Sequence, residues 1–222
     1  MRAGLVVAAL GAVALLAGLP ALHGHASRAV ADVPDVVLTP VGTFASPVYV
    51  TSPPGDPSRI FVVERGGTVR VVKNGVVLPT PFLDVASEIS TEGERGLLSI
   101  AFAPDYATSG LVYAYATETD GTIAIWEFHA APGADVADAG HRTVLAIPHT
   151  ATRHNGGQLQ FGPDGLLYIG VGDATVGANG QDTSVLLGKI LRIDPRTQPY
   201  SVGPGQPFAP GVAPEIYAYG LR

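Results

Sequence analysis

The chain has 222 residues, no cysteine and one methionine, with 13 Lys and Arg against 19 Asp and Glu. Without cysteine it has no disulfide scaffold, no cysteine-ligated zinc or iron–sulfur site and no thiol nucleophile. With 46% hydrophobic and 14% charged residues it is not a disordered chain, and its 28 glycines and 19 prolines, which follow no fixed period, predict many short strands and turns rather than collagen or a helical bundle.

Residues 1–31 have the features of a secretory signal peptide. Arg2 precedes an uncharged run rich in Ala, Leu and Val over residues 3–19, and Ala29-Val30-Ala31 supplies the small residues of a cleavage site. The alternative is an uncleaved membrane anchor, which needs roughly 20 apolar residues. We expect the segment to be removed, so that residues 32–222 are exported to the periplasm or the medium and no membrane span remains.

Removal of that segment takes away Arg2 and Arg28 but no acidic residue, which leaves 11 basic side chains against 19 acidic ones. The sequence has two lysines, Lys73 and Lys189, and no cluster of basic residues. A protein that binds nucleic acid presents a basic stripe to the phosphates. Neither nucleic acid nor an anionic membrane surface is therefore expected as a partner.

Short strand-like runs separated by Gly, Pro, Asp and Thr follow in three groups. The pair Asp120-Gly121 predicts a hairpin turn within the second group, and a fourth group is expected to begin at Pro214. The expected strands are Val48–Val50, Ile60–Glu64 and Thr68–Lys73 in the first group, Leu97–Ala103, Leu111–Ala116 and Thr122–Phe128 in the second, and Gln158–Phe161, Leu167–Val171 and Lys189–Ile193 in the third.

The groups resemble one another, which indicates a repeated unit. Ala103-Pro104-Asp105 and Gly162-Pro163-Asp164 each close an apolar strand, and the strands that begin at Thr68, Thr122 and Lys189 align at spacings of 54 and 67 residues. Such repeats are typical of β-propeller blades, and a β-sandwich is the alternative. We predict an all-β protein with about three and a half blades, the front part of a longer protein, because a ring closes with about 4–8 blades.

The glycine-rich stretch from His154 to Asp173 holds the most informative candidates for chemistry. His154 comes just before one expected strand and Asp173 just after the next, which places both at the same end of a hairpin. A carboxylate that fixes the tautomer of an imidazole makes it a good general base near neutral pH. Both residue types are also common in simple turns, so the residues alone leave that alternative open. His129, His141 and His149 are expected at the surface.

Two further stretches carry weaker signals. The loop 91–98 contains Glu92, Glu94 and Arg95, which alone resemble a self-neutralising turn in solvent. The segment 173–182 offers Asp and Asn side chains to a hard cation, but its spacing does not fit the twelve-residue calcium loop. No metal ligand is assigned to this sequence.

Four motifs in this order resemble the soluble glucose/sorbosone dehydrogenases, which depend on pyrroloquinoline quinone (PQQ). They are Gly93–Tyr106, His154–Asp173, Leu187–Asp194 and Ile216–Arg222. The resemblance implies a six-bladed β-propeller, of which residues 32–222 form the N-terminal part. It also implies an exported enzyme that oxidises the C1 hydroxyl of an aldose sugar to a lactone, with PQQ, Ca²⁺ and an external electron acceptor. The Ca²⁺ ligands are expected beyond the end of this chain.

The resemblance assigns roles to four residues. His154 matches the general base that takes the sugar hydroxyl proton while hydride passes to the quinone, and Asp173 matches its carboxylate partner. Arg222 matches an arginine beside the quinone oxygens, where a fixed cation stabilises negative charge. Glu94 stands beside the cofactor where well-known sugar oxidisers have Gln. Because PQQ carries three carboxylates, this acid is expected to weaken its binding unless Arg95 offsets the charge.

Two other functions compete with the dehydrogenase. An exported propeller of the hedgehog-interacting type, which binds a protein partner and performs no quinone chemistry, shares the stretch from Gly93 to Leu98, and Glu94 favours it. A metal-dependent lactonase-type propeller needs acidic and Asn ligands that converge near its axis, and few are found here.

Overall fold

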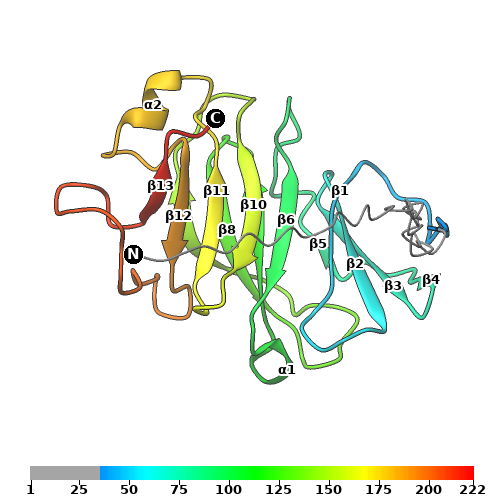
Figure 1. The fold of residues 1–222 in the computed structure, drawn as a ribbon. Helices are drawn as coiled ribbons and strands as arrows, with labels where there is room; N and C mark the ends of the chain where they lie inside the picture. Colours follow the sequence, from blue (N-terminus) through cyan, green and yellow to red (C-terminus); the bar gives the residue numbers. More distant parts are fainter. Residues whose placement is uncertain (1–35) are drawn as a thin grey trace, which may run out of the picture. The chain divides into compact units, whose positions relative to one another are not determined.

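A computed structural model describes residues 36–222, so the predicted signal peptide lies outside the described residues. The chain divides into two compact units, residues 1–39 and residues 40–222. In the first unit the described residues 36–39 are exposed and lie in neither helix nor strand. All named helices and strands belong to the second unit (Figure 1).

The strands of the second unit form three antiparallel sheets. The first sheet contains β1 (Pro47–Thr51), β2 (Arg59–Glu64), β3 (Thr68–Lys73), β4 (Val76–Val77) and β5 (Leu83–Asp84), the second β6 (Leu97–Phe102), β7 (Leu111–Thr117), β8 (Ile123–His129) and β9 (Arg142–Ile147), and the third β10 (Gly156–Phe161), β11 (Leu167–Val171), β12 (Lys189–Ile193) and β13 (Ile216–Tyr219). Two short helices, α1 (Tyr106–Ser109) and α2 (Gly177–Gln181), lie in loops. The all-β prediction is confirmed, and each expected strand is present.

The second and third sheets run up and down in sequence order, and the first does so from β1 to β4, while β5 pairs with β3. The predicted hairpin at Asp120-Gly121 joins β7 to β8. There the N–H of Thr122 donates to the Asp120 carboxylate at 2.8 Å, and Gly121 has a φ of 98°, which favours glycine. The side chains of successive residues then alternate between the two faces of each strand.

The second sheet lies between the other two and is buried on both faces. Ile125 and Trp126 are consecutive residues of β8, yet they belong to different apolar clusters. Trp126 packs with Phe61 and Val63 of the first sheet, whereas Ile125 packs in the cluster that contains Ile169 of the third sheet. This double burial explains why β8 is almost continuously apolar instead of alternating with polar residues.

The innermost strands β1, β6 and β10, one from each sheet, lie next to one another. The side-chain amide of Gln158 donates to the hydroxyl of Tyr49 at 3.2 Å, which links β10 to β1. The N–H of Leu159 donates to the Ser99 hydroxyl at 3.2 Å, which links β10 to β6. The loops at the ends of these strands are thereby brought to a common rim.

The prediction of a fourth group that begins at Pro214 is wrong. The strand that follows Pro214 is β13, and it pairs with β12 as the outer strand of the third sheet, with Lys189 opposite Tyr219 and Leu191 opposite Ile216. Ile216 is buried in the same apolar cluster as Leu191, which ties β13 to this sheet. The described residues therefore form three sheets instead of three and a half. None of the helices found in residues 36–222 has the length and apolar character needed to span a bilayer.

Candidate active site

His154 occupies the loop that leads into β10, and three hydrogen bonds hold its backbone. Its φ of 56° lies in the left-handed region, which is uncommon for a residue with a side chain. Its N–H donates to Oε2 of Glu94 at 2.9 Å. Its carbonyl oxygen accepts from Nε2 of His149 at 3.2 Å and from the N–H of Ala174 at 3.4 Å. A Cβ atom on Gly172 would lie 1.9 Å from the same carbonyl oxygen, so this close approach requires glycine.

The structure brings His154 and Asp173 together at one end of the β10–β11 hairpin. Gly156 of β10 pairs with Val171 of β11, so the residues just outside these positions meet at the same rim. The imidazole Nδ1 lies 2.7 Å from Oδ1 of Asp173. The Asp173 side chain is largely buried, and that of His154 is one-fifth exposed. This geometry holds the ring in one orientation while leaving it open on one side.

Asp173 is stabilised as a carboxylate. The hydrogen bond from His154 holds the pKa of Asp173 below its usual value of 3.8, and the N–H of Thr175, which donates to Oδ1 at 2.9 Å, acts in the same direction against the effect of burial. Ala174 and Thr175 follow with φ values of 56° and 64°. Two consecutive left-handed residues that are not glycine persist only where surrounding contacts hold them.

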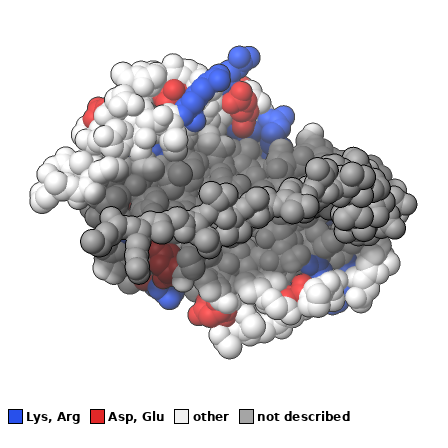
Figure 2. Space-filling model, viewed as in Figure 1, with Lys and Arg blue, Asp and Glu red and all other residues white. Residues whose placement is uncertain are grey.

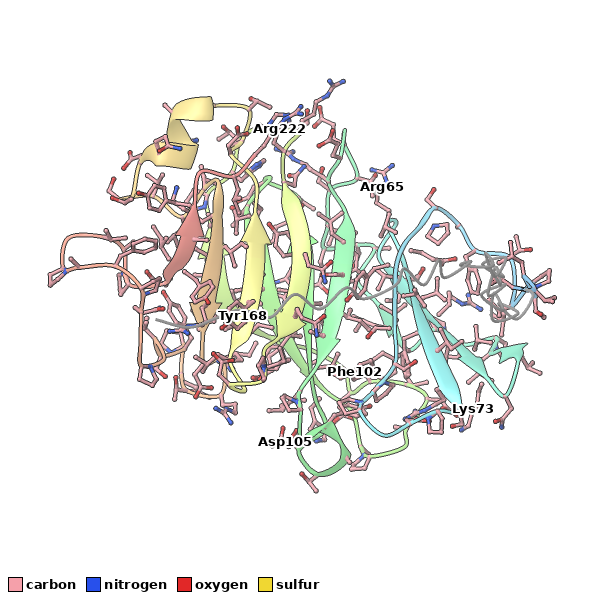
Figure 3. All side chains as sticks on the ribbon, viewed as in Figure 1. Arg65, Lys73, Phe102, Asp105, Tyr168 and Arg222 are labelled. Atoms are coloured by element: carbon pink, nitrogen blue, oxygen red, sulfur yellow. The ribbon has the colours of Figure 1, made fainter. Side chains whose placement is uncertain are left out.

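Arg222 comes to the same site from the third sheet, directly after β13. Its guanidinium lies 2.9 Å (Nη2) and 3.2 Å (Nε) from Nε2 of His154. Because a guanidinium has only donors, Nε2 accepts these bonds through its lone pair, and the ring proton is on Nδ1, facing Asp173. Figure 3 shows Arg222 at the opposite end of the sheets from Phe102 and Asp105.

Glu94 also reaches the site, but with a structural contact. Its carboxylate accepts the N–H of His154, as described above. Arg95 does not pair with Glu94. Its buried guanidinium donates to the carbonyl oxygen of Thr150 at 3.0 Å and lies 3.7 Å from Glu92. The charge of Glu94 is therefore engaged by a backbone N–H rather than offset by its neighbour.

The expectation that the other histidines lie at the surface is wrong for His149, which is buried beneath the site. Burial lowers its pKa below the usual 6.5, so it is a neutral donor to the carbonyl oxygen of His154. His129 is exposed and lies 2.6 Å from Asp138, and His141 stacks on Trp126 with ring centres 4.3 Å apart. Sequence spacing gives no signal for His149, because its contact is with backbone.

An open cavity of about 420 Å³ extends beside Arg222 along the inner strands. This volume is within the range of small-molecule sites. Its lining residues are Val48, Tyr49, Leu98, Gly156, Gly157, Gln158, Gly170, Val171, Leu221 and Arg222. Within residues 36–222, no three His, Asp or Glu side chains converge to hold a metal ion. On the face seen in Figure 2, the basic and acidic side chains of the described residues are interspersed.

The described residues thus form an all-β protein of stacked antiparallel sheets, with a histidine, a carboxylate and an arginine at one rim. The Glucose / Sorbosone dehydrogenase family model matches residues 44–222. The chain belongs to this family.

Named relatives include both enzymes and binding proteins. The chain is 32% identical to the human Hedgehog-interacting protein over 90% of its own length and 31% of that protein. It is 29% identical to the aldose sugar dehydrogenase YliI of Escherichia coli K12 over 75% of its own length and 46% of that protein.

Solved structures show the same fold. The PQQ-bound aldose sugar dehydrogenase of Streptomyces coelicolor matches with a TM-score of 0.70 and 35% identity, over 84% of this chain and 54% of that one. The apo-form of the soluble aldose sugar dehydrogenase of Escherichia coli matches with a TM-score of 0.68 and 28% identity, over 80% of this chain and 52% of that one. The chain thus spans about half the length of these solved relatives and less than half of the curated ones.

Proposed function

We propose that this protein is an exported, PQQ-dependent sugar dehydrogenase that oxidises the C1 hydroxyl of an aldose to a lactone, and that His154 is its general base. The observation that carries the proposal is the state of one imidazole. Nδ1–H of His154 is bonded to the Asp173 carboxylate, so the basic lone pair of the ring is on Nε2, where it accepts from Arg222. A base held in this tautomer can take a hydroxyl proton once a substrate hydroxyl replaces the arginine donor.

The residues at the rim fit the reacting edge of a quinone. Arg222 offers N–H donors beside Nε2 of His154, and the cavity next to it has room for a small molecule. The donor set suits carbonyl oxygens that gain negative charge during the reaction. PQQ, when bound, supplies the hydride acceptor. Arg222 would bind its oxygens, whereas Glu94 adds a negative charge that is already engaged by the His154 N–H.

Each residue then has a defined task when an aldose hydroxyl replaces the arginine donor at Nε2 of His154. The hydroxyl proton moves to Nε2 while the C1 hydrogen leaves with its electron pair, and the C1–O bond becomes a lactone carbonyl. Asp173 stabilises the imidazolium that forms and keeps the ring in place. An external electron acceptor completes the cycle by taking the two electrons.

The remaining parts of such an enzyme are proposed to lie outside this chain. They are the Ca²⁺ ligands, the other cationic contacts to PQQ and the blades that complete a six-bladed ring. The coverage of about half of the solved relatives supports this assignment.

The test is reduction of a redox dye by the full-length protein supplied with PQQ, Ca²⁺ and glucose. His154→Ala is expected to lower kcat by about 10²-fold or more, the usual contribution of a general base. His129→Ala serves as the matched control, because His129 is exposed and paired with Asp138 away from the site. Full activity of His154→Ala would remove His154 from the mechanism.

The second candidate function is a propeller that binds a protein partner without quinone chemistry. The 32% identity to the human Hedgehog-interacting protein and the acid at Glu94 favour it. A PQQ titration separates the two candidates: saturable binding to the full-length protein supports the enzyme, and its absence supports the binding protein.

A further inference from the structure

Lys189 begins β12 and is the only fully buried charged residue among those described. Its ammonium group donates to the carbonyl oxygens of Asn179 at 2.6 Å, Leu187 at 2.7 Å and Gly180 at 3.4 Å. Within the described part of the chain it forms no ion pair with a carboxylate. A buried charge without a counterion is costly, so its partners must repay that cost.

The partners of Lys189 are the carbonyl oxygens that the short helix α2 leaves free. Asn179 and Gly180 lie in its last turn, and the last carbonyls of a helix have no partner within the helix. A cation at this end is also favoured by the helix dipole. Leu187 lies just before β12. By bonding to its carbonyl oxygen and to those of α2, the ammonium joins the two ends of the loop between α2 and β12.

One side of this loop holds Asp173. The side-chain amide of Asn179 donates to the carbonyl oxygen of Asp173 at 3.0 Å. That bond secures the turn in which Ala174 and Thr175 have left-handed backbones. Lys189 is thus connected to the backbone of Asp173 through one intermediate residue, Asn179.

The other side of the loop holds the segment that carries Arg222. The N–H of Gly220 donates to the carbonyl oxygen of Gly180 at 2.7 Å, and the N–H of Leu221 donates to that of Gly188 at 3.1 Å. A Cβ atom on Gly188 would lie 2.7 Å from the Cα of Gly180, so helix α2 and the residue before β12 are in close contact here. The same ammonium group therefore supports both partners of His154.

We propose that Lys189 is a positioning residue: by tying α2 to β12 it sets where Asp173 and Arg222 stand around His154. The expected effect on kcat rests on the proposed function, whereas the expected effect on the positions of Asp173 and Arg222 does not. Burial lowers the pKa of Lys189 below its usual 10.5, against the opposing effect of the Asp182 charge.

The test uses full-length protein with Lys189→Met, which keeps the length of the side chain and removes its donors. Lys73→Met is the matched control, because Lys73 is the other lysine, lies on β3 of the first sheet and pairs with Asp135 in the loop after β8. Lys189→Met is expected to raise amide hydrogen exchange over residues 173–182 at least tenfold. It should also shift or broaden the NMR signal of the His154 Nδ1 proton. Lys73→Met should change neither.

Kinetics then distinguish positioning from general stability. Lys189→Met should lower kcat for the sugar about tenfold and change its pH profile, with KM affected less, because the proton acceptor is misplaced while the cavity remains. Unchanged exchange and an unchanged His154 signal in a folded Lys189→Met protein would overturn the proposal. If the wild-type protein lacks PQQ-dependent oxidation, the proposed function fails, and these two readouts still decide the role of Lys189.

Asn179→Ala covers the case in which Lys189→Met does not fold. It removes only the bond to the Asp173 carbonyl oxygen. A shifted His154 signal in this variant supports the connection through α2, and an unshifted signal overturns it. Where both single variants fold, the double variant should have an effect close to that of Lys189→Met alone, because both changes break the same connection.

Discussion

The carboxylate of Glu94 accepts the backbone N–H of His154 at 2.9 Å, across 60 positions of sequence. The acid holds the loop in which the histidine adopts a left-handed backbone. Its negative charge nevertheless remains beside the rim where PQQ is proposed to bind. Glu94 therefore stabilises the loop of His154 while its charge opposes the binding of PQQ.

Glu94→Gln separates these two effects. The amide oxygen of Gln can still accept the His154 N–H, but it carries no charge. We expect PQQ to bind about three- to tenfold more tightly, since removal of one exposed like charge is worth about 1 kcal/mol. Titration of the full-length protein with PQQ measures this change. Glu94→Ala is the comparison, because it removes both charge and acceptor. Weaker PQQ binding by Glu94→Gln would contradict the prediction.

Asp173→Asn is expected to reduce kcat by about 10²-fold or more with little change in overall fold. An amide at this position provides no charge to stabilise the imidazolium and can hold His154 in the wrong tautomer. Steady-state dye reduction with PQQ and glucose measures the loss. The control is Asp138→Asn, which removes the equivalent partner of exposed His129. A kcat close to wild type for Asp173→Asn would separate this carboxylate from proton transfer.

Gly172→Ala is expected to destabilise the protein by at least about 2 kcal/mol, because the added Cβ would collide with the carbonyl oxygen of His154 at 1.9 Å. Thermal unfolding of the two proteins measures the difference. Gly177→Ala is the matched control, since a Cβ there has no atom within 4 Å. Equal melting temperatures for Gly172→Ala and Gly177→Ala would show that the loop adapts without cost.

Acid should weaken the contact between the first and second sheets. Burial raises the pKa of Asp56, but hydrogen bonds from Ser58 and Arg59 outweigh it and lower the pKa to about 2. Because the folded protein lowers the pKa of Asp56 from 3.8, the ionised carboxylate stabilises the fold at pH values above about 4. This contribution to the free energy of unfolding is lost as the pH falls from about 4 to about 2. Arg59 also donates to the carbonyl oxygen of Ala134, which connects this carboxylate to the second sheet.

The measurement is urea unfolding as a function of pH. We expect Asp56→Asn to lower the free energy of unfolding at pH 7 by roughly 1–2 kcal/mol and to flatten its dependence on pH between 4 and 2. The control variant is Glu92→Gln, because the Glu92 side chain is 71% exposed. An unchanged slope for Asp56→Asn would show that other carboxylates cause the acid sensitivity.

Local patterns predict the strands well, and they fail where pairing spans long distances. Alternation and turn residues identify the inner strands, because those signals lie within a few residues. Strand β9 (Arg142–Ile147) is missed because it follows a loop of twelve residues rich in Ala and Gly, so no tight turn links it to β8. β13 is assigned to a new group because the residues between it and β12 hide their pairing, which depends on burial of Ile216 against Leu191.

The contacts of the candidate site likewise include some that local sequence predicts and others that it does not. The nearness of His154 and Asp173 follows from hairpin geometry and can be inferred from the residues alone. Arg222 comes to the site only through the pairing of β13, so the resemblance is its only signal in the sequence. The contacts made by Glu94 and His149 are with the backbone of His154 and depend on its left-handed conformation. No spacing rule predicts them.

The burial of β8 on both faces also decides what the protein's own fluorescence can report. Trp126 is the only tryptophan, and its indole faces the first sheet. Its emission will therefore follow the separation of the first and second sheets. The third sheet, next to which His154, Asp173 and Arg222 lie, contributes no residue to the apolar cluster of Trp126. An unfolding curve recorded by tryptophan emission therefore reports chiefly on the first and second sheets, and a second probe is needed for the proposed site.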